Sequence, residues 1–218
     1  AAQYSALLQQ YPQSLLAGKV ICKLGRIQAY ALRDLAAAQA SFLRLKDRES
    51  GGAYVVTSLY QLGLLAQWQG KLQEAREFYN LAVEKAGADF PHTRRLADAR
   101  IEEIGKGGAL ENNLQLFLDL SLKEENSAFS MSKVSLNASR YTVKKGETVT
   151  VDVSTQVPAS GCMQVQVENL WSGDAASATL TENGMSIAFD EPGIKVITMV
   201  AGTPSATIDR AVDLIDVE

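Results

Sequence analysis

Hydrophobic positions recur with two different periods along the chain, and the change falls near its middle. Up to about Glu125 the apolar residues follow helical spacing, in a sequence rich in Ala, Leu and Gln. From Met131 onward apolar and polar residues alternate and Val and Thr are frequent, as in Thr148–Val153, which is typical of half-buried strands. The pattern predicts a helical half followed by a strand-rich half.

The two patterns predict two domains of different class. We expect a helical domain over residues 1–125, a polar linker over residues 126–131 and a β domain over residues 132–218. A chain of 218 residues is long enough for two modest domains that each bury a core.

The helical half contains an internal repeat. Its better copy spans residues 59–82, and its characteristic positions are Leu62-Gly63, Ala66, Gly70, Ala75, Tyr79 and Ala82. A weaker copy runs from about Val20 to Lys46, with Leu24-Gly25, Ala29, Ala38 and Phe42 in the matching places. The two copies are 37 residues apart at the Ala and aromatic positions, whereas the Leu-Gly pair lies one residue out of this frame.

The small and aromatic residues of the better copy each have a mechanical explanation. Gly63 and Ala75 are small where two antiparallel helices would cross closely, and Gly70 permits a tight turn between them. Tyr79 would fill the space between one helix pair and the next. The surplus over a 34-residue period fits an insertion at residues 49–52.

These residues resemble the tetratricopeptide repeat (TPR), a pair of antiparallel helices that stacks into a solenoid. The segments Tyr11-Pro12-Gln13-Ser14 and Phe90-Pro91-His92-Thr93 each end in a hydroxyl residue that can cap a following helix. This punctuation is similar to that of bacterial envelope TPR proteins, such as the outer-membrane assembly lipoproteins and the periplasmic coordinator of cell division. We therefore expect further helices over residues 3–10, 94–104 and 109–123.

The resemblance implies a partner-binding groove lined by the first helix of each pair. Carried over position by position, the groove residues are Thr57, Tyr60, Leu64, Gln67 and Trp68 in the better copy and Lys23, Ile27 and Tyr30 in the weaker one. Aromatic residues suit a groove because they give contact area at little entropic cost. Packing of Tyr60 and Trp68 inside the fold is the alternative for those two side chains.

The second half predicts about seven short strands separated by turn signals, and hence an antiparallel β-sandwich. The segments 141–153 and 191–197 resemble the early and late strands of bacterial immunoglobulin-like (Ig-like) domains. The Cys…Trp…Cys pattern of antibody domains is missing from the sequence. Fibronectin-like and other sandwiches therefore stay open beside the Ig-like one.

Charge and residue supply exclude several classes of function. A net charge of −4 with dispersed basic residues argues against a nucleic-acid partner. His92 is the only histidine, and Cys22 and Cys162 lie far apart in the sequence, so neither a catalytic triad nor a zinc site is supported. We expect no enzymatic activity, no metal and no cofactor of the protein's own.

The cysteines and the chain start bear on location. Cys22 and Cys162 are expected to be small buried residues, and a disulfide between the two halves is the less favoured alternative. No apolar run reaches the ~18 residues of a membrane span. The chain opens on Ala-Ala-Gln without Met, which fits removal of a signal peptide. We expect export to the periplasm or the cell exterior.

The leading functional hypothesis is a non-catalytic scaffold of the bacterial envelope or exterior. Its repeat groove would hold a partner peptide, and its β-sandwich would dock a second surface or another copy. A first alternative is a subunit of an extracellular filament or sheath, around a partner peptide that bears a cofactor such as haem. A second is a secreted carbohydrate-binding or hydrolytic module, with Trp171, expected in a turn after a strand, as a sugar platform.

Overall fold

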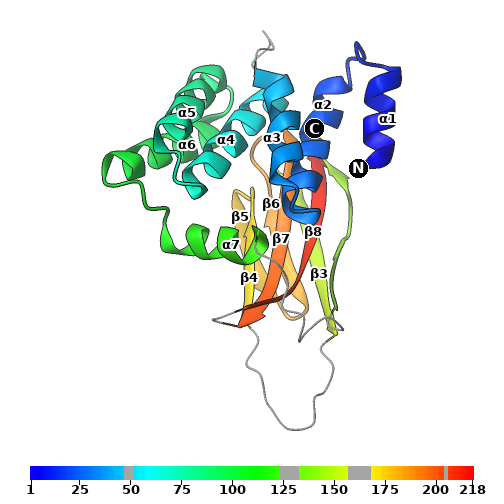
Figure 1. Ribbon diagram of the computed structural model, residues 1–218. Coiled ribbons are helices and arrows are strands. Elements are labelled where there is room, and N and C mark those ends of the chain that lie inside the picture. The colour runs from blue at the N-terminus through cyan, green and yellow to red at the C-terminus, as the bar shows by residue number, and fades with distance from the viewer. Residues whose placement is uncertain (47–51, 123–132, 157–167, 204–205) are drawn as a thin grey trace. The chain divides into compact units, whose positions relative to one another are not determined.

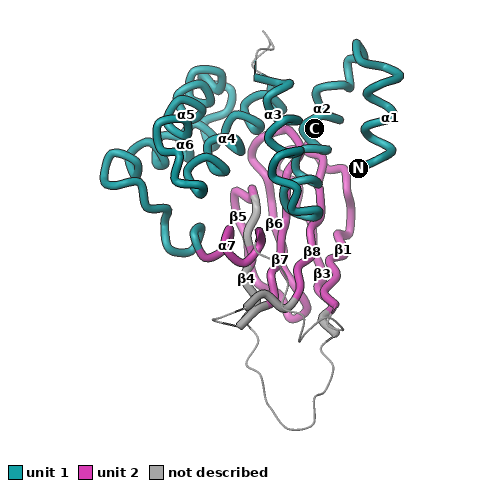
Figure 2. Tube along the Cα trace, viewed as in Figure 1, with its two compact units in different colours: residues 1–115 teal, residues 116–218 magenta. Residues whose placement is uncertain are grey.

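A computed structural model describes residues 1–46, 52–122, 133–156, 168–203 and 206–218 of the chain. The chain divides into two compact units, residues 1–115 and 116–218 (Figure 2). In the described residues seven α-helices and one π-helical turn precede eight strands (Figure 1), so the predicted order of a helical and a strand-rich half is confirmed. The predicted linker, Cys162 and the 49–51 part of the insertion lie outside the described residues.

The helical elements are α1 (Ala2–Gln10), α2 (Ala17–Arg26), η1 (Ile27–Ala31), α3 (Leu35–Lys46), α4 (Ala53–Trp68), α5 (Leu72–Ala86), α6 (Pro91–Gly105) and α7 (Asn112–Leu122). Consecutive helices contact one another from α1 to α6, and α4 also contacts α2 and α6. Contacts between both first and second neighbours are the pattern expected of stacked helix pairs. Helix α7 crosses the division between the two units.

A glycine in the first helix of each pair lies against an aromatic ring of the second. A Cβ atom at Gly25 would lie 2.5 Å from Cε1 of Phe42, and one at Gly63 would lie 2.6 Å from Cδ1 of Tyr79. Both rings are fully buried. Only glycine, whose side chain is a hydrogen atom, leaves room for the ring to approach this closely. The predicted close crossing at Gly63 is confirmed, and Gly25 is its counterpart in the other helix pair.

The one-residue offset between the two copies coincides with the π-helical turn. Ala29 lies four positions after Gly25, whereas Ala66 lies three positions after Gly63. The extra residue is taken up in η1, where the Leu32 N–H donates to the Ile27 carbonyl at 3.0 Å in an i to i+5 bond. A wider turn accommodates one more residue without ending the helix. Both glycines therefore pack on the aromatic ring at the equivalent position of the next helix.

The turn between the helices is also repeated. Gly70 has φ of +77° and Arg33, which lies 37 residues earlier, has φ of +55°. Asp34 then starts α3, because its Oδ1 accepts the Ala37 N–H at 2.9 Å. The predicted turn at Gly70 is confirmed, and Arg33 fills the same left-handed position without being a glycine.

The expected capping role of Thr93 is wrong. Helix α6 begins at Pro91 with Phe90 before it, so Thr93 lies inside the first turn and is buried. Proline suits this first position because its missing N–H would have no helical partner. Ser14 accepts the Leu16 N–H at 3.2 Å, ahead of the start of α2 at Ala17.

The strands are β1 (Lys133–Ala138), β2 (Thr142–Val143), β3 (Thr148–Gln156), β4 (Glu168–Gly173), β5 (Ser177–Thr181), β6 (Gly184–Ala188), β7 (Gly193–Thr203) and β8 (Ala206–Val217). They form two four-stranded sheets, ordered β1-β3-β6-β5 and β2-β8-β7-β4. The predicted antiparallel pairing holds except between β2 and β8, which are parallel. The chain passes from the first sheet to the second between β1 and β2. After this crossing β2 runs in the same direction as its neighbour β8.

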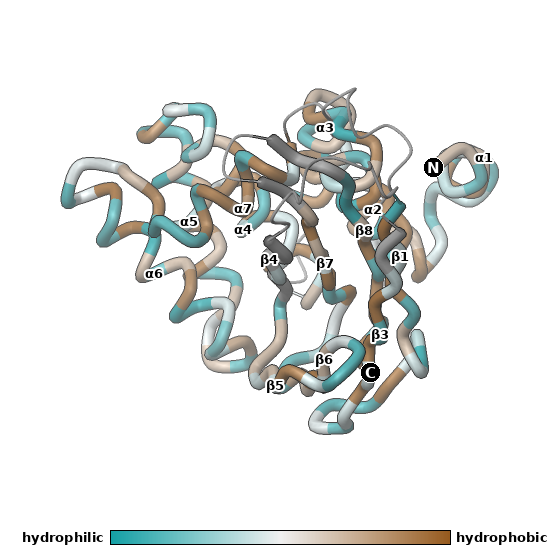
Figure 3. The backbone as a smooth tube through the Cα atoms, turned by 90° about the horizontal axis from the view of Figure 1, so that it is seen from below, coloured by the Kyte–Doolittle hydropathy of each residue, from teal (hydrophilic) through white to brown (hydrophobic). Residues whose placement is uncertain are grey.

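Strands of both sheets share one apolar core. Val149, Val151 and Ile187 from the first sheet cluster with Met199 and Ile215 from the second, and all are buried. The alternation seen in the sequence places these side chains on one face of each sheet. Figure 3 shows hydrophobic positions recurring along β3.

Two carboxylates of β8 cover the edge of β1. Asp209 accepts the Val134 N–H through Oδ2 at 2.5 Å, and Asp213 accepts the Ala138 N–H. Burial raises the pKa of Asp213, and the Ala138 hydrogen bond opposes that rise. Side chains of β8 thus bind N–H groups that an edge strand would otherwise expose.

Asp213→Asn is expected to raise the free energy of unfolding at pH 7 by about half a kcal/mol, a small value because solvent screens this half-buried group. The folded state holds the Asp213 proton to a higher pH than the unfolded state, so the ionised form is the destabilised one. The gain should shrink as the pH falls through the folded pKa towards the unfolded one. Urea unfolding at pH 7 and pH 3 measures it. Asp190→Asn, at an exposed residue, serves as the control and should change neither value.

Candidate functional site

The eight predicted groove residues are mostly enclosed. Thr57, Tyr60, Leu64 and Gln67 on α4 are buried together with Tyr30 of η1. Lys23, Ile27 and Trp68 are half-buried. Helix α4 has no charged residue and is buried continuously from Val55 to Gln67, as expected for a helix that is apolar on all sides.

Polar members of this set form hydrogen bonds inside the helical unit. The Tyr30 hydroxyl donates to Oε1 of Gln61 at 2.6 Å, and the Tyr79 hydroxyl donates to Oε1 of Gln67 at 2.9 Å. The Tyr60 and Tyr79 rings lie 5.7 Å apart at 50°, which is a favourable aromatic geometry. These bonds tie α4 to η1 on one side and to α5 on the other.

The Gln67 amide extends this network to α6. Its Nε2 donates to Oε2 of Glu103 and to the Gly108 carbonyl, both at 3.3 Å. Glu103 also pairs with the buried Arg100 at 2.9 Å, and Arg100 contacts Glu111 at 3.5 Å. Gln67 therefore has partners for both ends of its amide, as a buried side chain requires.

We interpret Tyr60 and Gln67 as residues that hold the helix pairs together. The repeat pattern did not point to Arg100 and Glu103. Their i, i+3 spacing and the two glutamines of an uncharged helix are nevertheless signals of a buried polar network. Substitutions at Tyr60 or Gln67 consequently report on stability before they report on binding.

Burial raises the pKa of Tyr79 well above its ordinary value, and the nearby Tyr60 adds to the rise. The raised pKa lowers the stability of the folded state only above about pH 10. There the unfolded chain releases the Tyr79 proton while the folded chain still holds it, so the free energy of unfolding falls as the pH rises. We expect the loss to approach about 1.4 kcal/mol per pH unit for this one proton. Tyr79→Phe should remove that part of the slope between pH 10 and 11.5 in chemical unfolding. Tyr141→Phe, at an exposed tyrosine, should leave the slope unchanged.

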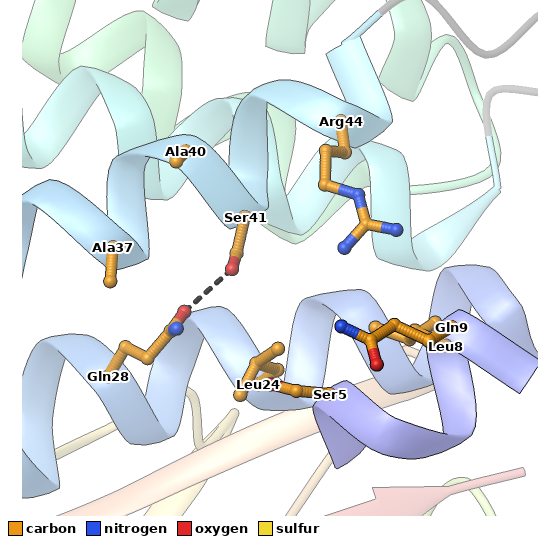
Figure 4. Close-up of a pocket in the computed structure, with 9 residues that line it drawn as sticks. All are labelled: Ser5, Leu8, Gln9, Leu24, Gln28, Ala37, Ala40, Ser41 and Arg44. Carbon is orange, nitrogen blue, oxygen red and sulfur yellow. Dashed lines mark hydrogen bonds between the residues drawn. The ribbon is translucent and has the colours of Figure 1, made fainter. Parts of the chain in front are cut away.

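An open pocket of about 360 Å³ lies between α1, α2 with η1, and α3 (Figure 4). Its apolar lining comes from Leu8 of α1, Leu24 of α2 and the small residues Ala37 and Ala40 of α3. The two alanines leave the space that larger side chains would fill. The π-helical turn contributes Gln28 to the wall, in keeping with the frequent occurrence of π turns at functional sites.

Polar groups surround this apolar lining. The Ser41 hydroxyl donates to Oε1 of Gln28 at 2.6 Å. This bond uses the oxygen of the Gln28 amide and not its N–H groups. Ser5 and Gln9 line the pocket from α1, and Arg44 lines it from α3. Figure 4 shows Arg44 and Gln9 extending toward the space between α1 and α3.

The pocket presents donors and acceptors without a strong acid or base for catalysis. A guanidinium group binds carboxylates through two parallel hydrogen bonds, and carboxamides match the peptide backbone. The polar groups of the lining are therefore of the kinds that pair with a carboxylate and with a peptide backbone. The repeat pattern did not reveal this pocket, because it depends on how three helices meet.

Other candidate residues have ordinary surroundings. His92 is half-buried at the start of α6, where its Nδ1 lies 3.1 Å from Nη2 of Arg95. Cys22 is buried, as expected. Trp171 lies within β4, paired with Met199, and packs against the core. The expectation that Trp171 follows a strand is wrong, because β4 continues to Gly173.

Among the described residues no cluster of three or more His, Cys, Asp or Glu side chains could hold a metal ion. In the same part of the chain, no helix combines the length and apolar character needed to cross a membrane. Comparison of the chain with protein-family models, curated proteins and solved structures finds no match.

Proposed function

We propose that this protein is a non-catalytic, protein-binding scaffold whose helical unit holds a segment of a partner polypeptide. The observation that carries the proposal is the open pocket between α1, α2 and α3, built on a repeated helix pair. Its apolar lining with amide, hydroxyl and guanidinium groups suits a peptide with an acidic side chain.

The helical unit is proposed to be a TPR-like solenoid. Two features that recur after 37 or 38 residues support this assignment. One is the glycine packed on an aromatic ring, at Gly25 and again at Gly63. The other is the left-handed turn residue, at Arg33 and again at Gly70. In solenoids of this kind, neighbouring repeats create extended binding surfaces.

The β unit is proposed to be an Ig-like sandwich that offers a second interaction surface. Its support is the strand order: β1-β3-β6-β5 corresponds to A-B-E-D of that fold, and β8-β7-β4 corresponds to G-F-C. The short β2 beside β8 corresponds to a first strand that switches sheets. This assignment describes an architecture that serves many binding functions, so the partner is a separate question.

We further propose that the protein acts in the bacterial envelope or outside the cell, in the periplasm or the extracellular space. The support is the resemblance of its Tyr-Pro-x-Ser punctuation to that of envelope TPR proteins. Trp171, the expected sugar platform of the alternative carbohydrate-binding function, packs on the β core.

The scaffold proposal is tested by filling the pocket. Ala40 is exposed and lines the pocket, whereas Ala36 is exposed on the same helix and lies outside its lining. Ala40→Trp should abolish capture of partner polypeptides from the native source, measured by mass spectrometry of proteins retained on the immobilised chain. Ala36→Trp, the matched control, should retain them. Equal capture by both variants would show that the pocket does not bind the partner.

A further inference from the structure

Strand β5 is an exposed and uncharged sheet edge. It is the last strand of the sheet β1-β3-β6-β5, and all five of its residues are exposed. Leu180 is 70% exposed. The strand Ser177–Thr181 contains no charged residue and no proline, which are the usual means of preventing an edge from pairing with another strand.

The other edge of the same sheet is protected. Asp209 and Asp213 of β8 accept the N–H groups of Val134 and Ala138 on β1. Strand β5 lies at the opposite edge, and among the described strands only β6 pairs with it. In an antiparallel ladder every second residue of an edge strand directs its N–H and C=O away from its partner. Those groups of β5 are available to a further strand.

The face of β5 that bears Leu180 continues the apolar core to the rim of the sheet. Leu180 pairs with Met185, and Ala178 pairs with Ile187. Directly paired residues project on the same face. Ile187 is buried in the core and Met185 packs against that core. An added strand with an apolar residue on this face would therefore extend the core and cover Leu180.

We propose that β5 pairs antiparallel with β5 of a second copy of the chain, about a two-fold axis through Thr179. In this register Leu180 faces Ala178 of the other copy, and Ser177 faces Thr181. Thr179 faces its own counterpart, and Thr–Thr pairs are favourable across strands. No like charges oppose each other within the strand.

A second copy fits this edge because the strand is self-complementary. A two-fold contact requires the same patch on both subunits, and β5 places its small, apolar and hydroxyl residues symmetrically about Thr179. Both Leu180 side chains lie on one face, diagonal to each other and within reach across the pair. Five residues bury little area, so the dimer should be weak and concentration-dependent.

Disulfide trapping tests this register. In the proposed dimer the two Cα atoms at position 179 lie about 4.5–5.5 Å apart, within the range of a disulfide. Position 177 is displaced from its own counterpart by four residues, or about 13 Å. With Cys162 replaced by Ser, Thr179→Cys should form a disulfide-linked dimer under mild oxidation, and Ser177→Cys should form at least tenfold less. Equal trapping of both variants, or of neither, would overturn the proposal.

Analytical ultracentrifugation of the unmodified chain gives a second test. Its average mass should rise with concentration, whereas Leu180→Lys should stay monomeric because two like charges meet near the axis. Tyr141→Lys, at another exposed hydrophobic residue, is the matched control and should associate like the parent chain. A parent chain that stays monomeric up to millimolar concentration would contradict the pairing, whatever the helical pocket binds.

Discussion

Gly63→Ala is expected to lower the free energy of unfolding of the helical unit by about 2 kcal/mol or more. Alanine is the better helix former by about 1 kcal/mol, so propensity alone predicts the opposite sign. The added methyl group, however, would overlap the Tyr79 ring, and because that ring is fully buried, moving it would disturb the packing around it. Urea unfolding followed by circular dichroism at 222 nm measures the change.

Gly105→Ala is the matched control for this prediction. Gly105 is also helical, but nothing lies within 4 Å of a Cβ atom placed there. This variant should be neutral or stabilised by up to about 1 kcal/mol. If Gly63→Ala were equally harmless, α4 and α5 would not cross as closely as described.

Gln67→Ala is expected to cost about 3 kcal/mol, because it leaves buried hydrogen-bonding groups without a partner. The Tyr79 hydroxyl would lose its acceptor at 2.9 Å. Glu103 and the Gly108 carbonyl would lose a donor. Denaturant unfolding of the helical signal gives the free energy, and retained secondary structure before the transition shows that the fold persists.

Gln73→Ala provides the same substitution at an exposed position. Gln73 donates to Glu77 at 3.1 Å on the surface of α5, and such exposed pairs contribute only about 0.3 kcal/mol. The control should therefore unfold almost like the parent chain. If Gln67→Ala changed the free energy of unfolding as little as Gln73→Ala, the hydrogen bonds of Gln67 would not contribute to the stability of the helical unit.

The helical fold could be predicted from the sequence because its packing repeats. The small residues at Gly63 and Ala75 and the ring of Tyr79 mark one helix pair, and the 37-residue frame locates the other. The offset at Gly25 was visible, but its cause was not. Periodicity does not show whether an extra residue forms a loop or a π turn, and here it forms η1.

The candidate site was predicted less well, for a physical reason. Repeat positions tell which residues lie on the first helix of a pair, but not whether that face stays open. Tyr60 and Gln67 are buried. The sequence signal for their burial is the absence of charged residues from Ala53 to Trp68. The pocket near Ala40 depends on contacts among three helices, which no local pattern encodes.

In the β unit the alternation located the core strands, yet it could not give their pairing. Thr148–Val153 falls within β3, as expected. The parallel pairing of β2 and the continuation of β4 beyond Trp171 depend on partners far away in the sequence. The open edge at β5 likewise became evident only from the strand order.

Photo-crosslinking from position 40 tests the central claim most directly. A photoreactive phenylalanine derivative would replace Ala40, inside the pocket lining, or Ala36, outside it on the same helix. In native extract, position 40 should cross-link to one defined segment of a partner polypeptide, identified by mass spectrometry, and position 36 should not. Equal labelling from both positions, or none from position 40, would contradict a peptide-binding pocket between α1, α2 and α3.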